Sequence, residues 1–140
     1  MADANAPAIG SIGWMDMAVE NADQVRDFYA AIAGWQSQGI DMGGYNDYVM
    51  IDPSGKPVGG VCHARGPNVG LPKAWLIYIV VEDLDASLAR CRELGGEAIT
   101  EPKTAGGGRY CVIRDPAGIA VSLYQTLPAA PAEGGKQEYE

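Results

Sequence analysis

Two ionisable side chains, Asp16 and His63, occur in segments whose pattern places them where chemistry could be done. Each lies in an alternating stretch typical of a β-strand, residues 12–19 and 58–63, on the side expected to carry Trp14. A carboxylate and an imidazole on one face could form a general acid/base pair, anchor a polar ligand, or hold a metal ion weakly. For His63 the alternative is a solvated side chain at the exit of its strand.

Three aromatic residues are expected on the same face. Trp14, Tyr78 and Tyr124 combine a flat ring with a polar tip, which suits a planar or amphipathic small molecule. The alternative for each ring is packing between parts of the chain. A face that mixes aromatic, polar and small residues is typical of a ligand cleft. We therefore expect Trp14, Asp16, His63, Tyr78 and Tyr124 to bind a small molecule.

Charge and composition exclude several other classes of protein. The 140 residues include 18 acids and 10 bases, a net charge of −8, and this acidity disfavours nucleic acids and anionic membranes as partners. No apolar stretch approaches the roughly 18 residues that cross a bilayer, and residues 1–8 lack the pattern of a signal peptide. We expect a cytoplasmic protein.

The cysteines and glycines give little further chemistry. Cys62, Cys91 and Cys111 have neither zinc-site nor disulfide-framework spacing, so we interpret them as buried thiols in a reducing compartment. The glycine run at 106–108 precedes Arg109, which could contact an anionic ligand. It lacks the following helix that a nucleotide loop requires.

Two similar halves must position the candidate residues. In the first half a strand precedes a helix that starts after Asn21 and stops at Gly34; in the second, Asp83 can cap the corresponding helix. An Asp-Pro-x-Gly turn follows in each half, at 52–55 and 115–118. Corresponding residues are 62 or 63 positions apart, which indicates an internal repeat.

These patterns predict an α+β fold built from two βαβββ modules. The modules, at about 9–64 and 73–127, would form a curved eight-stranded mixed sheet around a cleft. They would make up a single domain over 9–127, with a flexible stretch at 1–8 and a mobile tail at 128–140.

Several motifs in this frame carry a family resemblance. They are Phe28-Tyr29 followed by Gly34-Trp35, the step Val81-Glu82-Asp83-Leu84-Asp85, the helix end Leu94-Gly95-Gly96, and the turn Arg114-Asp115-Pro116-x-Gly118. Together they resemble the vicinal oxygen chelate superfamily, which includes glyoxalase I, extradiol dioxygenases, fosfomycin-resistance enzymes and bleomycin-resistance proteins. The likeness covers about residues 9–126.

The resemblance implies a cleft, a homodimer and, in the family's enzymes, a divalent metal ion. His, Glu or Gln on the first and last strands of each module hold that metal. The corresponding positions here are Trp14, Gly59, Leu76 and Ser122, and none of them supplies a good metal ligand. The resemblance is therefore to members that lack the metal site, and we expect neither metal nor other cofactor.

Three functions remain open at this level. The first is a metal-free protein that binds a small aromatic or amphipathic molecule. The second is a metal-independent isomerase, epimerase or lyase in which Asp16 or His63 transfers a proton next to a carbonyl. The third, least favoured, is a metal-dependent glyoxalase-type lyase or dioxygenase that uses Asp16 and His63 as unusual ligands.

Overall fold

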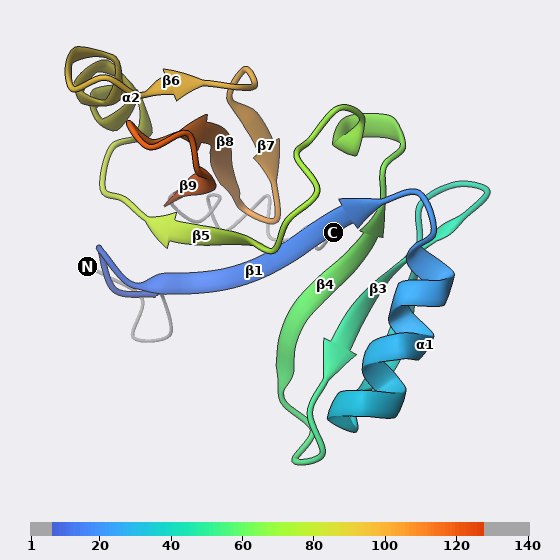
Figure 1. Cartoon of the computed structure of the whole chain (residues 1–140). Coiled ribbons are helices and arrows are strands. Elements are labelled where there is room, and N and C mark those ends of the chain that lie inside the picture. Colours follow the sequence, from blue (N-terminus) through green and yellow to red (C-terminus); the bar gives the residue numbers. More distant parts are fainter. Residues whose placement is uncertain (1–6, 128–140) are drawn as a thin grey trace, which may run out of the picture. The chain divides into compact units, whose positions relative to one another are not determined.

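The computed structural model describes residues 7–127 (Figure 1). Within this range the chain forms two α-helices and nine strands, with both parallel and antiparallel pairs. The predicted α+β fold with a mixed sheet is thereby confirmed. The flexible stretch expected at 1–8 and the tail at 128–140 fall, apart from residues 7 and 8, outside the described residues.

The chain divides into two compact units, which are treated separately below. The first half is residues 14–76; the second half is residues 77–127 with the segment before Trp14. These units follow the predicted internal repeat, whereas the proposed limits of a single domain stay a prediction.

The first half consists of one helix and four strands. They are β1 (Ile12–Val19), α1 (Ala22–Ala33), β2 (Gln36–Asp41), β3 (Asn46–Ile51) and β4 (Pro57–His63), followed by a 3-10 turn at Gly66–Asn68. Strands β2, β3 and β4 pair antiparallel, and β1 pairs parallel with β4.

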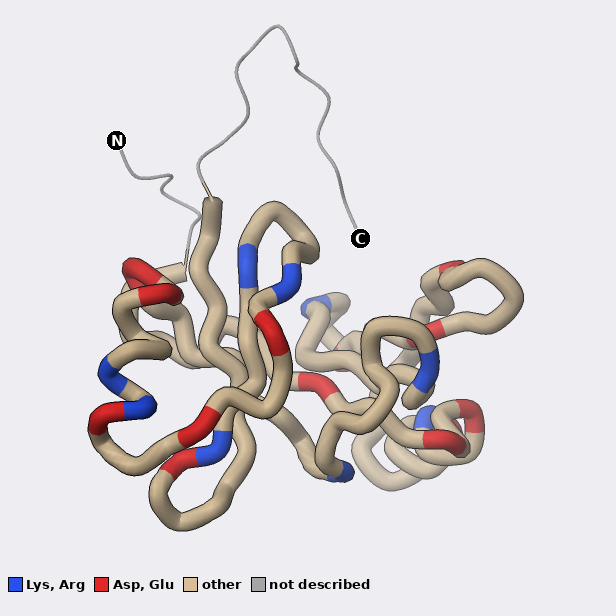
Figure 2. Tube along the Cα trace, turned by 90° about the horizontal axis from the view of Figure 1, so that it is seen from above, with Lys and Arg blue, Asp and Glu red and all other residues tan. Residues whose placement is uncertain are grey.

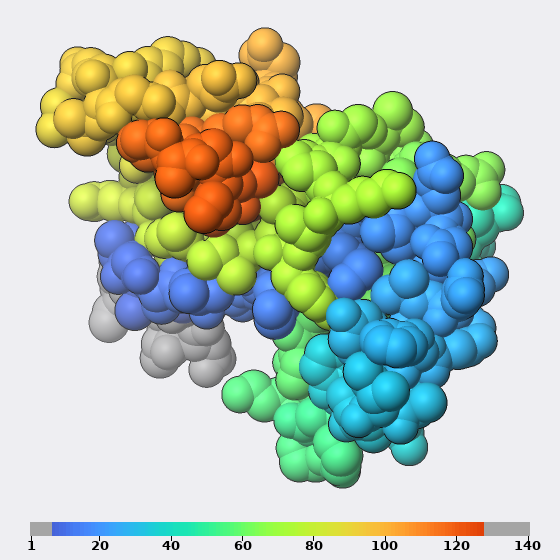
Figure 3. Space-filling view, in the orientation of Figure 1, coloured from blue at the N-terminus to red at the C-terminus, as the bar shows by residue number. Residues whose placement is uncertain are grey.

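Helix α1 covers one side of this sheet. Buried residues Met17, Tyr48, Met50 and Val61 form a core beneath it, and Figure 3 shows its atoms massed against the neighbouring strands. The helix ends as predicted at Gly34, whose φ of 73° suits a residue without a Cβ. The start differs from expectation. Asn21 caps no backbone N–H and instead donates to the Gln24 side chain.

The second half repeats this order with one more strand. Its elements are β5 (Leu76–Val80), α2 (Leu84–Glu93), β6 (Glu97–Ala98), β7 (Lys103–Ala105), β8 (Gly108–Arg114) and β9 (Ala120–Thr126). The prediction of eight strands was one short because β6 and β7 replace a single strand. Pro102, which has no N–H for the ladder, lies between them.

Matching local contacts support the repeat. Asp83 accepts a hydrogen bond from the Ala86 N–H and caps α2, as predicted. In the two Asp-Pro turns, the carboxylates of Asp52 and Asp115 each accept two backbone N–H groups in the same pattern. The two halves thus use the same turn chemistry.

Candidate functional site

The register of β1 against β4 separates the two candidate ionisable residues. In this parallel pair Asp16 lies beside Gly60 and Val19 beside His63. Laterally paired residues point to the same face and successive residues alternate. Asp16 and His63 therefore point to opposite faces of the sheet, and the expectation of a shared face was wrong.

The error came from the face assigned to β4. Val61, two residues before His63 and on the same face, pairs with Met17 and is fully buried in the core against α1. The pairing of β3 with β4 shifts register at Met50/Ile51. An irregularity of this kind is set by the fold and carries no clear sequence signal. Consequently Asp16 and His63 cannot act as a pair or share a metal ion.

Asp16 lies on the side of the first half turned away from α1. By alternation Trp14 is on the same side, and the Cys62 thiol is there beside Gly60. Burial raises the pKa of Cys62, and the carboxylates of Asp16 and Asp47 raise it further. This thiol therefore stays protonated near neutral pH.

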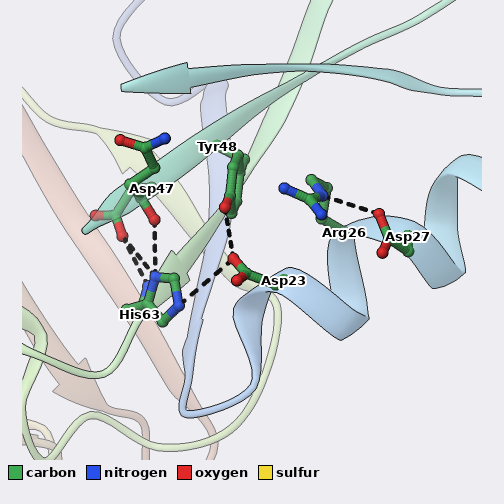
Figure 4. Close-up of polar contacts among 7 residues, drawn as sticks. Asp23, Arg26, Asp27, Asp47, Tyr48 and His63 are labelled. Carbon is green, nitrogen blue, oxygen red and sulfur yellow. Dashed lines mark hydrogen bonds and ion pairs between the residues drawn. The ribbon is translucent and has the colours of Figure 1, made fainter. Parts of the chain in front are cut away.

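His63 lies at the end of β4 on the helix side, and its imidazole is 14% exposed. Its Nδ1 is 2.7 Å from the Asn46 carbonyl oxygen, and since a carbonyl can only accept, Nδ1 carries the proton. Nε2 is 3.7 Å from Asp23 Oδ1, while Nδ1 is 3.6 Å from Asp47 Oδ1 (Figure 4). The imidazole thus lies between two carboxylates.

Neighbouring groups fix these carboxylates. The buried Asp47 accepts a hydrogen bond from the His63 backbone N–H at 2.8 Å. The Tyr48 hydroxyl donates to Asp23 Oδ1 at 2.5 Å, and this bond together with burial raises the pKa of Tyr48. Arg26 lies over the Tyr48 ring, 4.6 Å from its centre. The arrangement connects α1, β3 and β4 through polar contacts.

An open pocket of about 710 Å³ includes His63. It is lined by Asp23, Asp41, Gly44, Tyr45, Asn46, Tyr48, His63 and Arg65. Sequence reasoning identified only His63 in this set, because the alternation of β3 left its faces unassigned. The available signal was the polar run Tyr45-Asn46-Asp47-Tyr48 at the start of β3. Arg65 lies over the Tyr45 ring, 4.1 Å from its centre.

In the second half the predicted aromatic residues do come together. Tyr78 pairs with Ser122, two residues before Tyr124 on β9, so both tyrosines point away from α2. Tyr110, which sequence reasoning missed, lies opposite Tyr124 on β8, and its ring centre is 5.9 Å from that of Tyr78. The Tyr124 hydroxyl donates to the Gly106 carbonyl. We call these three residues the tyrosine face.

The family's metal ion does not fit the positions that would hold it. Leu76 is buried, and the buried Ser122 hydroxyl donates to the Cys111 carbonyl. Gly59 alternates with Gly60, which pairs with Asp16, so Gly59 lies on the helix side and not with Trp14, and the position expected for it was wrong. Trp14 offers no lone pair for a metal. These positions cannot support the family's metal chemistry.

The remaining described residues show two further features. Residues 7–127 contain no cluster of three or more His, Cys, Asp or Glu that could hold a metal ion. In the same range no helix is both long and apolar enough to cross a membrane. Figure 2 shows Lys and Arg scattered among Asp and Glu along the chain.

Comparison with known proteins identifies a family model. The model described as Glyoxalase/Bleomycin resistance protein/Dioxygenase superfamily matches residues 11–123. Among curated proteins, CFP32 of Mycobacterium tuberculosis, provisionally named a glyoxylase, is 28% identical over 120 residues. The anthracycline biosynthesis protein DnrV of Streptomyces peucetius is 30% identical over 126 residues. The matches cover 85% and 90% of this chain but only 45% of each relative, so the chain spans under half their length.

Solved structures share the fold. Methylmalonyl-CoA epimerase from Mycobacterium tuberculosis has a TM-score of 0.53 at 17% identity, covering 89% of this chain and 95% of that one. The Mn(II)-bound glyoxalase from Novosphingobium aromaticivorans has a TM-score of 0.55 at 20% identity, covering 90% of this chain and 44% of that one. At such identities the likeness concerns the fold alone.

Proposed function

The chain belongs to the Glyoxalase/Bleomycin resistance protein/Dioxygenase superfamily, and from this premise we propose that it binds a small aromatic or amphipathic molecule without a metal ion. The observation that carries the proposal is the tyrosine face of the second half. Three rings with polar tips gather on three adjacent strands, on the side away from the helix-covered core. This is the composition of a ligand wall.

The loss of metal-binding chemistry supports the same function. Trp14, Leu76 and Ser122 offer no good metal ligand, and the two buried ones, Leu76 and Ser122, are occupied in packing or hydrogen bonding. Trp14 and Asp16 stay candidate ligand contacts of the first half taken by itself, on its side away from α1. His63 is no longer one of these candidates because it points to the helix side.

A flat, neutral and fluorescent compound tests this proposal directly. We would titrate the chain with an anthracycline aglycone, because a relative at 30% identity is named for anthracycline biosynthesis, and follow the quenching of its fluorescence with and without EDTA. We expect saturable binding unchanged by the chelator. Tyr78→Ala should weaken it roughly tenfold, the scale of one lost aromatic contact.

Tyr45→Ala is the matched control, since Tyr45 lines the helix-side pocket and not the tyrosine face. It should leave the affinity unchanged. Binding that needs an added divalent ion would contradict the proposal. Equal losses in the two variants would show that the probe associates non-specifically.

Proton transfer by His63 is a second candidate function, favoured by one specific observation. With Nδ1 donating to the Asn46 carbonyl, the neutral ring keeps the lone pair of Nε2, which lies beside the pocket. Nε2 could accept a proton from a carbon next to a carbonyl and return it. His63→Gln should then lower turnover by roughly 10²–10⁴-fold, the usual contribution of a general base, whereas Asp16→Asn should not.

A further inference from the structure

The two halves differ at the place where the start of the helix meets the end of the last strand, which we call the corner of each half. With the repeat offset of 62, Asp23 at the start of α1 corresponds to Asp85 in α2, and His63 at the end of β4 corresponds to Gln125 in β9. In the second half both groups have fixed partners. The Arg109 guanidinium pairs with the Asp85 carboxylate at 3.2 Å, and Gln125 Oε1 accepts the Leu84 N–H at 2.7 Å.

The corresponding corner of the first half has no such fixed cation. Within residues 7–127, no lysine or arginine lies within 4.0 Å of the Asp23 carboxylate. Arg26, about one helical turn further along α1, pairs with Asp27 at 2.9 Å instead. Asp23 faces the imidazole of His63, and their separation of 3.7 Å is longer than a hydrogen bond. Where the second half closes its corner with an ion pair, the first half has an open pocket.

The protonation of His63 determines what this pocket offers. Because Nδ1 donates to the Asn46 carbonyl, the neutral ring presents Nε2 as an acceptor. Nε2 and Asp23 Oδ1 are then two acceptors 3.7 Å apart, and the one donor that reaches this oxygen among the described side chains is the uncharged Tyr48 hydroxyl. A donor with several N–H groups and a positive charge would satisfy both.

We propose that the pocket formed by Asp23, Asp41, Tyr45 and His63 binds the primary ammonium group of a small organic cation. The ammonium donates to His63 Nε2 and to the Asp23 carboxylate, taking the role that Arg109 has beside Asp85. Two lining carboxylates, Asp23 and Asp41, outnumber the one lining arginine, Arg65, which is already over the Tyr45 ring. The field therefore favours a cation.

An organic cation fits this site better than a metal ion does. The volume of about 710 Å³ lies within the range of small-molecule pockets, so the ammonium would be one end of a larger molecule. The described residues contain no set of three ligands for a metal. The site is on the helix side of the first half, so the proposal stands whether or not the tyrosine face binds a ligand.

The test is a nuclear magnetic resonance titration of the full ¹⁵N-labelled chain with 1,4-diaminobutane, using 1,4-butanediol as a matched neutral probe. At constant ionic strength, the diamine should produce saturable shifts of the amides at Asp23, Tyr45 and His63, and the diol none. Asp23→Asn should weaken binding roughly tenfold, the scale of one charge-assisted hydrogen bond. Asp85→Asn, the equivalent change in the second half, should leave it unchanged.

The proposal is overturned if no saturable shift occurs up to about 10 mM diamine, the range of a weak site. It is equally overturned if Asp85→Asn weakens binding as much as Asp23→Asn.

Discussion

The two halves of this chain share the same order of elements. They differ in the contacts that side chains make at the end of the last strand, on the face toward the helix. In the second half, Arg109 and Gln125 hold the start of α2 through an ion pair and a backbone hydrogen bond. In the first half, His63 lies between Asp23 and Asp47 beside an open pocket. The second half pairs its carboxylate with an arginine, whereas the first half places an imidazole between two carboxylates. A repeated fold can thus keep a structural ion pair in one copy and an open pocket at the equivalent place in the other.

The cores should respond alike if the halves differ only in their sites. Met50 in β3 and Ile113 in β8 are equivalent by the repeat offset of 63, and both are buried. Truncation of either to alanine should cost about 2–5 kcal/mol of unfolding free energy, the usual cost of a core cavity. Urea denaturation measures this. A loss of unfolding free energy in only one of the two variants would show that the core of the other half contributes little to stability.

The buried thiols provide a sharper difference. Burial raises the pKa of Cys62, and the carboxylates of Asp16 and Asp47 add to the shift. Because the thiolate is the reactive form, a raised pKa slows alkylation at any pH below it. Labelling of Cys62 by iodoacetamide at pH 8 should be about a hundredfold slower than in the unfolded chain.

Asp16→Asn removes one of the charges that keep Cys62 protonated, so it should speed this labelling a few-fold. The Cys111 thiol in the second half is the internal control, because its pKa is raised by burial without a contribution from Asp16. Mass spectrometry of the digested chain reads both sites in one sample. Equal acceleration at Cys111 would indicate general loosening of the fold.

Asp47 should contribute more to the unfolding free energy than the Arg109–Asp85 ion pair of the second half. It is buried and accepts the His63 backbone N–H at 2.8 Å. Asp47→Ala leaves that donor without its partner and should cost about 1–3 kcal/mol. Asp47→Asn, which keeps an acceptor oxygen, should recover part of the loss. Thermal unfolding checks both, and no loss in the alanine variant would mean that solvent replaces the carboxylate.

The smallest effect is expected at the ion pair of the second half. Asp85 is largely exposed, so Arg109→Ala should change the unfolding free energy by less than about 1 kcal/mol. It should not change diamine binding in the first half. A larger loss would show that this corner has a role beyond the one assigned here.

Sequence reasoning reached the fold because its signals are local. The helix end at Gly34, the cap at Asp83 and the paired Asp-Pro turns each depend on residues close in sequence. The strand count failed at Pro102, where the ladder is interrupted between two very short strands.

The candidate site was predicted only in part because it depends on register. Tyr78 and Tyr124 share a face as predicted, since simple alternation holds in β5 and β9. Asp16 and His63 do not, because the face of β4 depends on its pairing with β1 and β3. Asp23 and Asp47 come near His63 only through tertiary packing, which no local pattern reveals.

The central claim is that this superfamily member binds its ligand without a metal ion, and metal content tests it most directly. The full chain would be purified without an affinity tag or chelator and analysed by plasma mass spectrometry. The account predicts well below one transition metal per chain. One tightly held manganese, iron, nickel or zinc ion per chain would contradict it, because Trp14, Leu76 and Ser122 could not hold that ion.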